Sequence, residues 1–158
     1  MAKSKVTSKK TTFLAKAETP PKQTDQEWFF TSLLGLLFVV MAILQLASFN
    51  DFKDALSNTG FSNPTTWGTL IIAIELWASA AFFKLRLSTA FRRASGFFAL
   101  VVSGFWFYES IRVVSDGMTL TNSGYFGRFL ALSPDLWTTL AASVVLAWTL
   151  WAVERTQR

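Results

Sequence analysis

Glu75 is the residue whose type and position most clearly suggest chemistry. It interrupts an otherwise apolar run from Trp67 to Phe83, which approaches the length of a membrane-spanning helix. A carboxylate at the centre of a bilayer costs roughly 3 kcal/mol or more, so it is retained where it faces a protein interior, finds partners or is protonated. Glu75 is therefore the first candidate for a functional site.

Three states of Glu75 are compatible with this position. The acid can be neutral, can pair with a cation, or can face a cavity filled with water or ligand. No Lys or Arg lies near the centre of any apolar run, which favours a neutral, hydrogen-bonded acid. Packing alone is a poor account of this residue, because Ala or Gln would pack there at lower cost.

The face of the run that carries Glu75 also carries Gly68 and Ser79, while Trp77 lies on the opposite side. Similar stripes of small or weakly polar residues recur on three other apolar runs, and such stripes allow helices to pack closely in lipid. They comprise Gly35, Ala42 and Gln45 on the first run, Gly96, Ala99, Ser103, Trp106 and Ser110 on the third, and Thr139, Ser143 and Ala147 on the fourth.

These stripes supply candidate partners for the acid, although packing alone explains most of the small residues. We expect a ligand or proton site that combines Glu75 with Ser79, Ser103, Trp106, Thr139, Ser143 and Gln45. Gln45 lies nearer the outer surface, about 10 Å from the midplane at 1.5 Å per residue, so we do not expect it to contact Glu75 directly.

Glu109 is the second carboxylate of interest. It lies near the outer end of the third run, beside Tyr108 and one turn before Arg112. A Glu–Arg pair with this spacing near a membrane interface is usually a surface ion pair that contributes little to stability. The alternative is an outer vestibule site made by Tyr108, Glu109 and Arg112, and the sequence leaves both interpretations open.

Cys and His are both absent, which removes several classes of chemistry. This chain cannot supply disulfides, Cys/His zinc sites, haem ligation by His or Cys, or a Ser-His-Asp triad. No nucleophile is identifiable, so we expect a protein that is not an enzyme, and the sequence names no cofactor. Of its 158 residues, 51% are hydrophobic, and charges are crowded between long apolar stretches, which is typical of an integral membrane protein.

Four apolar segments follow a polar beginning. Residues 1–27 are rich in Lys, Thr and Ser and predict a flexible, basic cytoplasmic tail. The segments cover about 28–49, 65–83, 95–114 and 136–153, each near the roughly 20 residues needed to cross a hydrocarbon core. Backbone groups in lipid must be paired internally, so each segment should be helical. The sequence therefore predicts an all-α fold in which residues 28–158 form an integral membrane four-helix bundle.

Basic residues are distributed unevenly between the polar segments. The tail holds six lysines, and the loop after the second apolar segment holds Lys84, Arg86, Arg92 and Arg93, whereas the other two loops have one basic residue each. This asymmetry predicts that both termini are cytoplasmic. We expect the four loop residues to contact anionic lipid, and we expect no nucleic-acid binding, because the basic clusters are short and lack a soluble domain.

The two outer loops differ in character. In the first, Phe49, Phe52 and Leu56 recur at helical spacing, which predicts a short amphipathic helix on the outer membrane surface. The second, residues 115–135, contains several glycines and other turn-forming residues. It predicts turns, with interfacial contact through Tyr125 and Phe126.

Several loosely spaced features lie within residues 33–100: Gly35, Leu46, the segment Phe52-x3-Leu56-x3-Gly60-x3-Pro64, and Ile74-Glu75-Leu76. In these features the chain resembles the DoxX-like family of four-span bacterial and archaeal membrane proteins, which includes the DoxD and MauE branches. Family members often have a Gly-x-x-Lys pattern late in the first span. Here the corresponding run is Ala42-Ile43-Leu44-Gln45, so Gln45 stands where the family has the lysine.

The resemblance implies a redox-linked partner, as in quinol oxidase, thiol-stress or methylamine-utilisation systems. Because this chain lacks Cys, any redox group would belong to a partner or to a bound quinone. We therefore expect a non-enzymatic accessory or assembly subunit of a membrane complex in the bacterial cytoplasmic (inner) membrane. The alternative is a small proton-linked transporter, or a quinone- or lipid-binding membrane protein, that uses Glu75. A third, weaker hypothesis is an enzyme acting on a lipid-soluble substrate.

Overall fold

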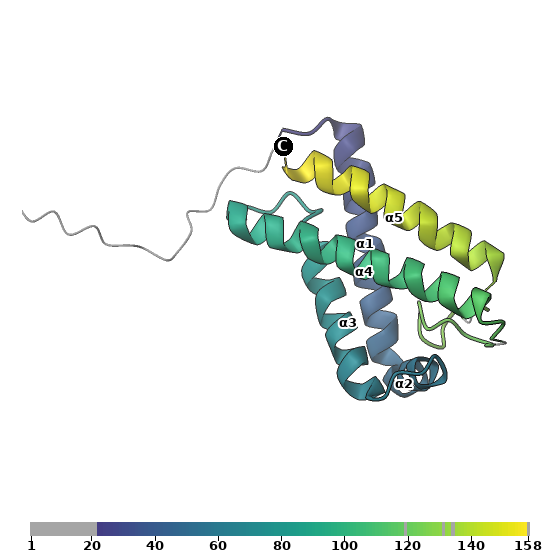
Figure 1. The fold of residues 1–158 in the computed structure, drawn as a ribbon. Coiled ribbons are helices and arrows are strands. Elements are labelled where there is room, and N and C mark those ends of the chain that lie inside the picture. The colour runs from purple at the N-terminus through teal and green to yellow at the C-terminus, as the bar shows by residue number, and fades with distance from the viewer. Residues whose placement is uncertain (1–21, 119, 131, 134, 158) are drawn as a thin grey trace, which may run out of the picture.

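The computed structural model describes residues 22–118, 120–130, 132–133 and 135–157. In these residues the fold is all helical, as predicted (Figure 1). The five helices are α1 (Asp25–Ala47), α2 (Phe49–Asn58), α3 (Pro64–Ser79), α4 (Thr89–Ser115) and α5 (Leu136–Gln157). Most of the predicted tail, residues 1–21, lies outside the described residues, so its flexibility stays a prediction.

Capping side chains explain why two of the long helices begin before the predicted boundaries. Thr24 and Glu27 form a capping box, in which each side chain accepts a hydrogen bond from the backbone N–H of the other, so α1 begins at Asp25. Ser88 caps α4 by accepting from a backbone N–H in the first turn, so that helix begins at Thr89.

The long helices form two antiparallel pairs. α1 packs against α3 and α4 packs against α5, while contacts of α3 with α4 and of α1 with α5 join the pairs into a closed ring. In Figure 1 the ribbons of α4 and α5 cross that of α1, and α4 also lies across the end of α3, so the four long helices do not all run side by side. The bundle is therefore built from two crossed pairs.

α2 is the short amphipathic helix that the sequence predicts. Its apolar residues Phe52, Ala55 and Leu56 are buried against the bundle. The ring of Phe52 contacts that of Trp106, with 6.3 Å between the centroids. α2 therefore uses its apolar face to cover one end of the bundle, and its placement on the outer membrane surface stays a prediction.

Three helices, α1, α4 and α5, are long and apolar enough to cross a membrane, judged by length and composition. α3 has 16 residues, which corresponds to about 24 Å and is shorter than a hydrocarbon core of about 30 Å. Beyond Ser79 the chain continues through three consecutive i to i+3 hydrogen bonds that end at Phe82, so this last turn is tighter than an α-helix. The fourth span stays a prediction.

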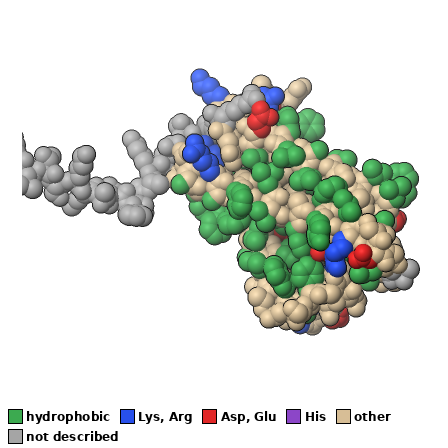
Figure 2. Space-filling view, viewed as in Figure 1, with side chains coloured by type: hydrophobic (Ala, Val, Ile, Leu, Met, Phe, Trp, Pro, Cys, Tyr) green, Lys and Arg blue, Asp and Glu red, His purple; other side chains and the backbone are tan. Residues whose placement is uncertain are grey.

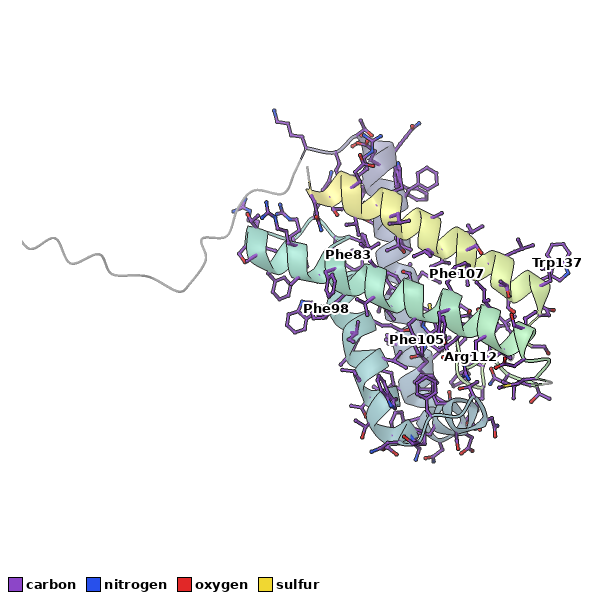
Figure 3. All side chains as sticks on the ribbon, viewed as in Figure 1. Phe83, Phe98, Phe105, Phe107, Arg112 and Trp137 are labelled. Carbon is purple, nitrogen blue, oxygen red and sulfur yellow. The ribbon has the colours of Figure 1, made fainter. Side chains whose placement is uncertain are left out.

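Large apolar side chains cover the outside of the bundle. Exposed examples include Leu46, Trp77, Phe97 and Val144, and Figure 2 shows apolar side chains spread over the visible face. Trp137 is 75% exposed and points away from the bundle at the start of α5 (Figure 3). Soluble monomers rarely expose so much apolar surface, whereas a protein surrounded by lipid does.

The predicted packing faces are confirmed on α1, α3 and α4 and are wrong on α5. On α5 the predicted Ala147 is exposed, and Thr139 and Ser143 are half-buried. The face that packs instead carries Thr138, Ala142, Thr149 and Ala152. The two faces start one residue apart, or about 100° around the helix, and both carry small residues, so residue size does not distinguish them.

Replacing Gly35 with Ala is expected to destabilise the α1–α3 pair. A Cβ at this position would lie 3.0 Å from Phe82 Cβ, which is attached to the backbone and cannot turn away. We expect a loss of about 1–3 kcal/mol, measured as a lower melting temperature in detergent. Gly104→Ala is the matched control, because a Cβ there meets nothing within 4 Å. Equal melting temperatures for the two variants would contradict close α1–α3 packing.

Candidate functional site

Glu75 is fully buried within the bundle, where one of its oxygens accepts two hydrogen bonds. Glu75 Oε1 lies 2.8 Å from Trp106 Nε1 of α4 and 3.3 Å from Gln45 Nε2 of α1. The predicted partnership with Trp106 is confirmed. A single carboxyl oxygen therefore joins α1, α3 and α4.

The contact between Gln45 and Glu75 corrects the expectation that depth keeps them apart. In a helix each side chain leans toward the N-terminus of its own helix. Gln45 is near the C-terminal end of α1 and Glu75 is near that of α3, and the two helices are antiparallel. Both side chains therefore lean toward each other and close a gap that the rise per residue alone would leave open.

The orientation of the Gln45 amide is fixed by a second partner. Gln45 Nε2 also donates to the backbone oxygen of Tyr125 at 3.0 Å, and because that oxygen can only accept, the amide nitrogen must face it. Within the described residues, Glu75 Oε2 and Gln45 Oε1 are buried without a hydrogen-bond partner. The site can therefore hold a proton on Glu75 Oε2 or accept a further donor from water or a ligand.

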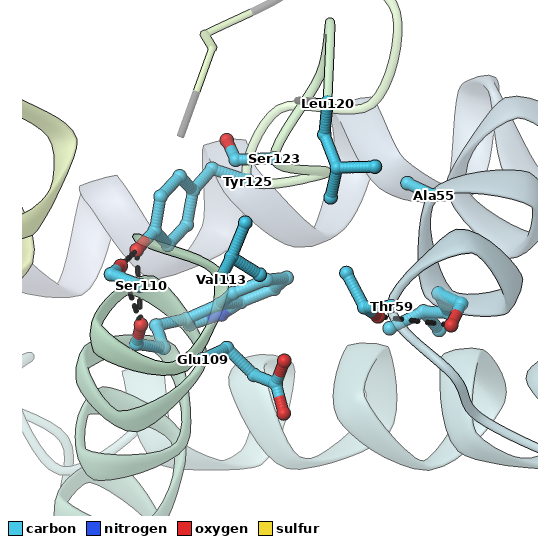
Figure 4. Close-up of a pocket in the computed structure, with 10 residues that line it drawn as sticks. Ala55, Thr59, Glu109, Ser110, Val113, Leu120, Ser123 and Tyr125 are labelled. Atoms are coloured by element: carbon cyan, nitrogen blue, oxygen red, sulfur yellow. Dashed lines mark hydrogen bonds between the residues drawn. The ribbon is translucent and has the colours of Figure 1, made fainter. Parts of the chain in front are cut away.

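Tyr125 enters the bundle from the segment between α4 and α5. Its hydroxyl donates to the Trp106 backbone oxygen at 3.0 Å and contacts the hydroxyl of Ser110 (Figure 4). Its ring centroid lies 4.6 Å from that of Trp106. Burial raises the pKa of the Tyr125 phenol to about 12, so the hydroxyl stays protonated at physiological pH. The predicted interfacial position of Tyr125 is wrong, while Phe126 is half-buried against the core.

Two glycines allow this segment to approach the helices. Gly124 and Gly127 have φ values of +84° and +56°, a region that glycine adopts without strain. A Cβ on Gly124 would lie 3.3 Å from Ala55 Cβ of α2, so the segment packs closely on that helix. The sequence signal is Gly124-Tyr125-Phe126-Gly127, in which two aromatic residues lie between glycines, and it predicts a turn with interfacial contact but not the burial of Tyr125.

The hydroxyl residues predicted to surround the buried acid have other partners. Ser103 pairs with Thr149 of α5 at 2.9 Å. Ser79, Thr139 and Ser143 donate to backbone oxygens three or four residues earlier in their own helices or caps. None of the four predicted hydroxyls has a described hydrogen bond to the acid, because a hydroxyl on a helix can bond to its own backbone.

Glu109 and Arg112 form an ion pair with 2.7 Å between Oε2 and Nη2, and Arg112 also donates to the backbone oxygen of Thr59 at the end of α2. The C-terminal end of a helix favours a cation, so the Arg112 side chain links α4 to α2. Glu109 is 8% exposed and, with Tyr125, lines a cavity of about 20 Å³ (Figure 4). Tyr108 is 61% exposed, so the predicted outer vestibule lacks its third member.

A larger apolar cavity of about 110 Å³ lies between α1, α4, α5 and the segment that carries Tyr125. Its wall includes Phe38 and Met41 of α1, Trp106 of α4 and Ala142 of α5. Trp106 therefore contributes its ring to this cavity and its Nε1 hydrogen to Glu75 Oε1. The sequence does not predict the cavity, because its wall comes from four separate segments.

In the described part of the chain, no three acidic side chains gather closely enough to hold a metal ion. Comparisons with protein-family models, with curated proteins and with solved structures give no match. The resemblance to the DoxX-like family therefore rests on the residues quoted above and stays a prediction.

Glu75→Gln is expected to keep a melting temperature close to that of the wild type, because an amide oxygen can still accept from Trp106 and Gln45. Glu75→Leu leaves the Trp106 N–H and one of the two Gln45 amide N–H groups without an acceptor, which should cost about 1–3 kcal/mol for each. Thermal unfolding in detergent distinguishes the two variants. If Glu75→Leu proved as stable as Glu75→Gln, the two hydrogen bonds would not be what holds the three helices together.

Proposed function

We propose that this chain is a non-enzymatic membrane protein that binds the hydrocarbon part of a lipid-soluble molecule in the apolar cavity, with Glu75 as the group that responds to binding. The position of Trp106 carries this proposal. Its ring forms part of the cavity wall, and its Nε1 donates to Glu75 Oε1 at 2.8 Å. A molecule in the cavity therefore touches the side chain that holds the buried acid.

The size of the cavity favours a hydrocarbon chain over a ring as its occupant. Its volume of about 110 Å³ is smaller than the roughly 150 Å³ of an apolar cavity that holds benzene. Only a few hydroxyl residues, such as Ser103 and Thr138, interrupt its apolar wall. We propose the end of an acyl or isoprenoid chain as the occupant, since a quinone ring would require the cavity to widen.

Occupancy of the cavity and protonation of Glu75 are linked in this proposal. A molecule that shifts the Trp106 ring changes the shorter of the two hydrogen bonds to the carboxyl group. Such bonds are stronger when the carboxyl group is charged, so binding and protonation become coupled, and the coupling is reciprocal. A proton-linked transporter, which is the alternative that the sequence suggests, would rest on the same coupling.

We further propose that all four long helices lie in a bacterial cytoplasmic membrane with both termini in the cytoplasm. Exposed apolar side chains on α1, α3, α4 and α5 support this placement, as does the basic loop before α4. The tight turn that continues α3 to Phe82 lengthens the helical path available for crossing.

Filling the cavity tests lipid binding. Ala142 lines the cavity, whereas Ala147 is exposed on the same helix. We expect a photoreactive diazirine lipid to label peptides of α1, α4 and α5 around the cavity in the wild type and in Ala147→Phe, and to lose that labelling in Ala142→Phe. Peptide mass spectrometry locates the label. Identical labelling of the two variants would mean that only surrounding lipid is detected, and the proposal would be wrong.

A second proposal is an accessory or assembly subunit of a larger membrane complex. An ordered aromatic cluster on the rim favours it. Trp77 of α3 is 45% exposed, yet it stacks on Phe91 with 5.5 Å between centroids and meets Phe98 edge-on at 5.1 Å. Rings that are already held in place lose little conformational freedom when a partner helix docks on them.

Replacing Trp77 with Ala is expected to reduce recovery of a membrane-protein partner when the chain is purified in mild detergent. Trp137→Ala is the matched control, because Trp137 is also exposed and points away from the bundle at the start of α5. Quantitative mass spectrometry of the purified samples gives the ratio of partner to chain. Equal recovery with both variants, or no stoichiometric partner with the wild type, would contradict the accessory-subunit proposal.

A further inference from the structure

A recess at one end of the bundle gathers hydrogen-bond donors. α1 and α4 begin at this end, and α5 ends there (Figure 1). The recess is lined by Gln23, Lys84, Arg92 and Thr156, together with apolar side chains that include Phe82. Among the described residues no Asp or Glu contributes to its wall.

Two of these donors are buried without an acceptor. Arg92 Nη2 and Gln23 Nε2 are both shielded from solvent, and neither has a hydrogen-bond partner in the part of the chain that the structure describes. Guanidinium and amide nitrogens only donate, and buried donors in folded proteins are nearly always paired. The two donors in the recess therefore require a hydrogen-bond acceptor from outside the described residues.

The electrostatic environment favours an anion as that acceptor. Residues 84–93 contain four basic residues and no acidic one. Arg92 lies in the first turn of α4, where the positive end of the helix dipole normally favours acidic side chains, and this turn has none. Glu27, at the same end of the bundle, is engaged in an ion pair with Arg155 at 3.1 Å.

We propose that this recess binds a phosphate group through Arg92, Lys84 and Gln23. Its volume of about 10 Å³ is close to the roughly 10–15 Å³ that one water needs, so one phosphate oxygen enters while the rest of the group stays at the mouth. Arginine matches phosphate with parallel donors. The apolar wall at Phe82 suits a phosphate that belongs to a lipid, and a soluble phosphate ester is the other source.

The proposed site is more specific than a basic surface that attracts anionic lipid. Arg93 follows Arg92 in the chain and carries the same charge, but it is exposed and does not line the recess. Gln23 is uncharged and does line it. Non-specific attraction would depend on both arginines equally and on Gln23 not at all. The site is separate from the apolar cavity and does not depend on the function proposed for Glu75.

Binding to the full chain in neutral detergent, followed by native mass spectrometry, tests this proposal. The probe is dioleoyl phosphatidic acid, and dioleoylglycerol, which lacks the phosphate, is its control. We expect Arg92→Gln and Gln23→Leu to bind the probe about fivefold more weakly or worse, since each loses a hydrogen bond to a charged group. Arg93→Gln should stay within about twofold of the wild type, as an exposed charge contributes little.

Competition identifies the source of the phosphate. If glycerol 3-phosphate or inorganic phosphate displaces the lipid, the site accepts a soluble phosphate, and if neither does, the site is specific for a lipid. Equal weakening by Arg92→Gln and Arg93→Gln, or wild-type binding by Gln23→Leu, would overturn the proposal. Gln23→Leu removes no charge, so it keeps the test informative even if Arg92→Gln fails to fold.

Discussion

A carboxyl group that is removed from water needs hydrogen-bond donors, and this requirement at Glu75 organises the bundle. Its two donors come from different helices, Gln45 of α1 and Trp106 of α4. The three helices must therefore converge on one oxygen atom, which sets how far each is shifted along its neighbours. Small residues such as Gly35 permit that convergence. The apolar cavity depends on the same interaction, because the indole ring in its wall is held by its own N–H group.

The same network extends to the non-helical segment before α5. Gln45 uses its second N–H on the backbone oxygen of Tyr125, and the hydroxyl of Tyr125 bonds to the backbone of Trp106. Irregular backbone among packed helices is tolerated in a membrane protein when its polar groups are buried in protein. The two ends of the bundle thus differ. At the end where α1 and α4 begin, buried donors of Gln23 and Arg92 have no such partner in the described residues.

Local properties explain what the sequence predicts well. Hydrophobic runs and caps are local, so the helices and the packing faces of α1, α3 and α4 are predictable. The contact between Gln45 and Glu75 is not predictable in the same way. The rise per residue locates only the Cα atoms, whereas contact depends on the direction in which each side chain leans. On α5 the stripes that begin at Thr138 and Thr139 both consist of small residues, so residue size does not show which of them packs. For Tyr125, the flanking glycines indicate a turn but not the side toward which it folds, which only the surrounding helices decide.

Chain synthesis delivers the partners of Glu75 one at a time. Gln45 precedes the acid by 30 residues, so an amide donor is already present when α3 forms. Trp106 follows the acid by 31 residues, and Tyr125 comes later still. A nascent α1–α3 hairpin can therefore hold the acid only through the longer, 3.3 Å contact. The hairpin alone leaves the acid with one of its two donors, and the packing of α4 supplies the shorter hydrogen bond from Trp106.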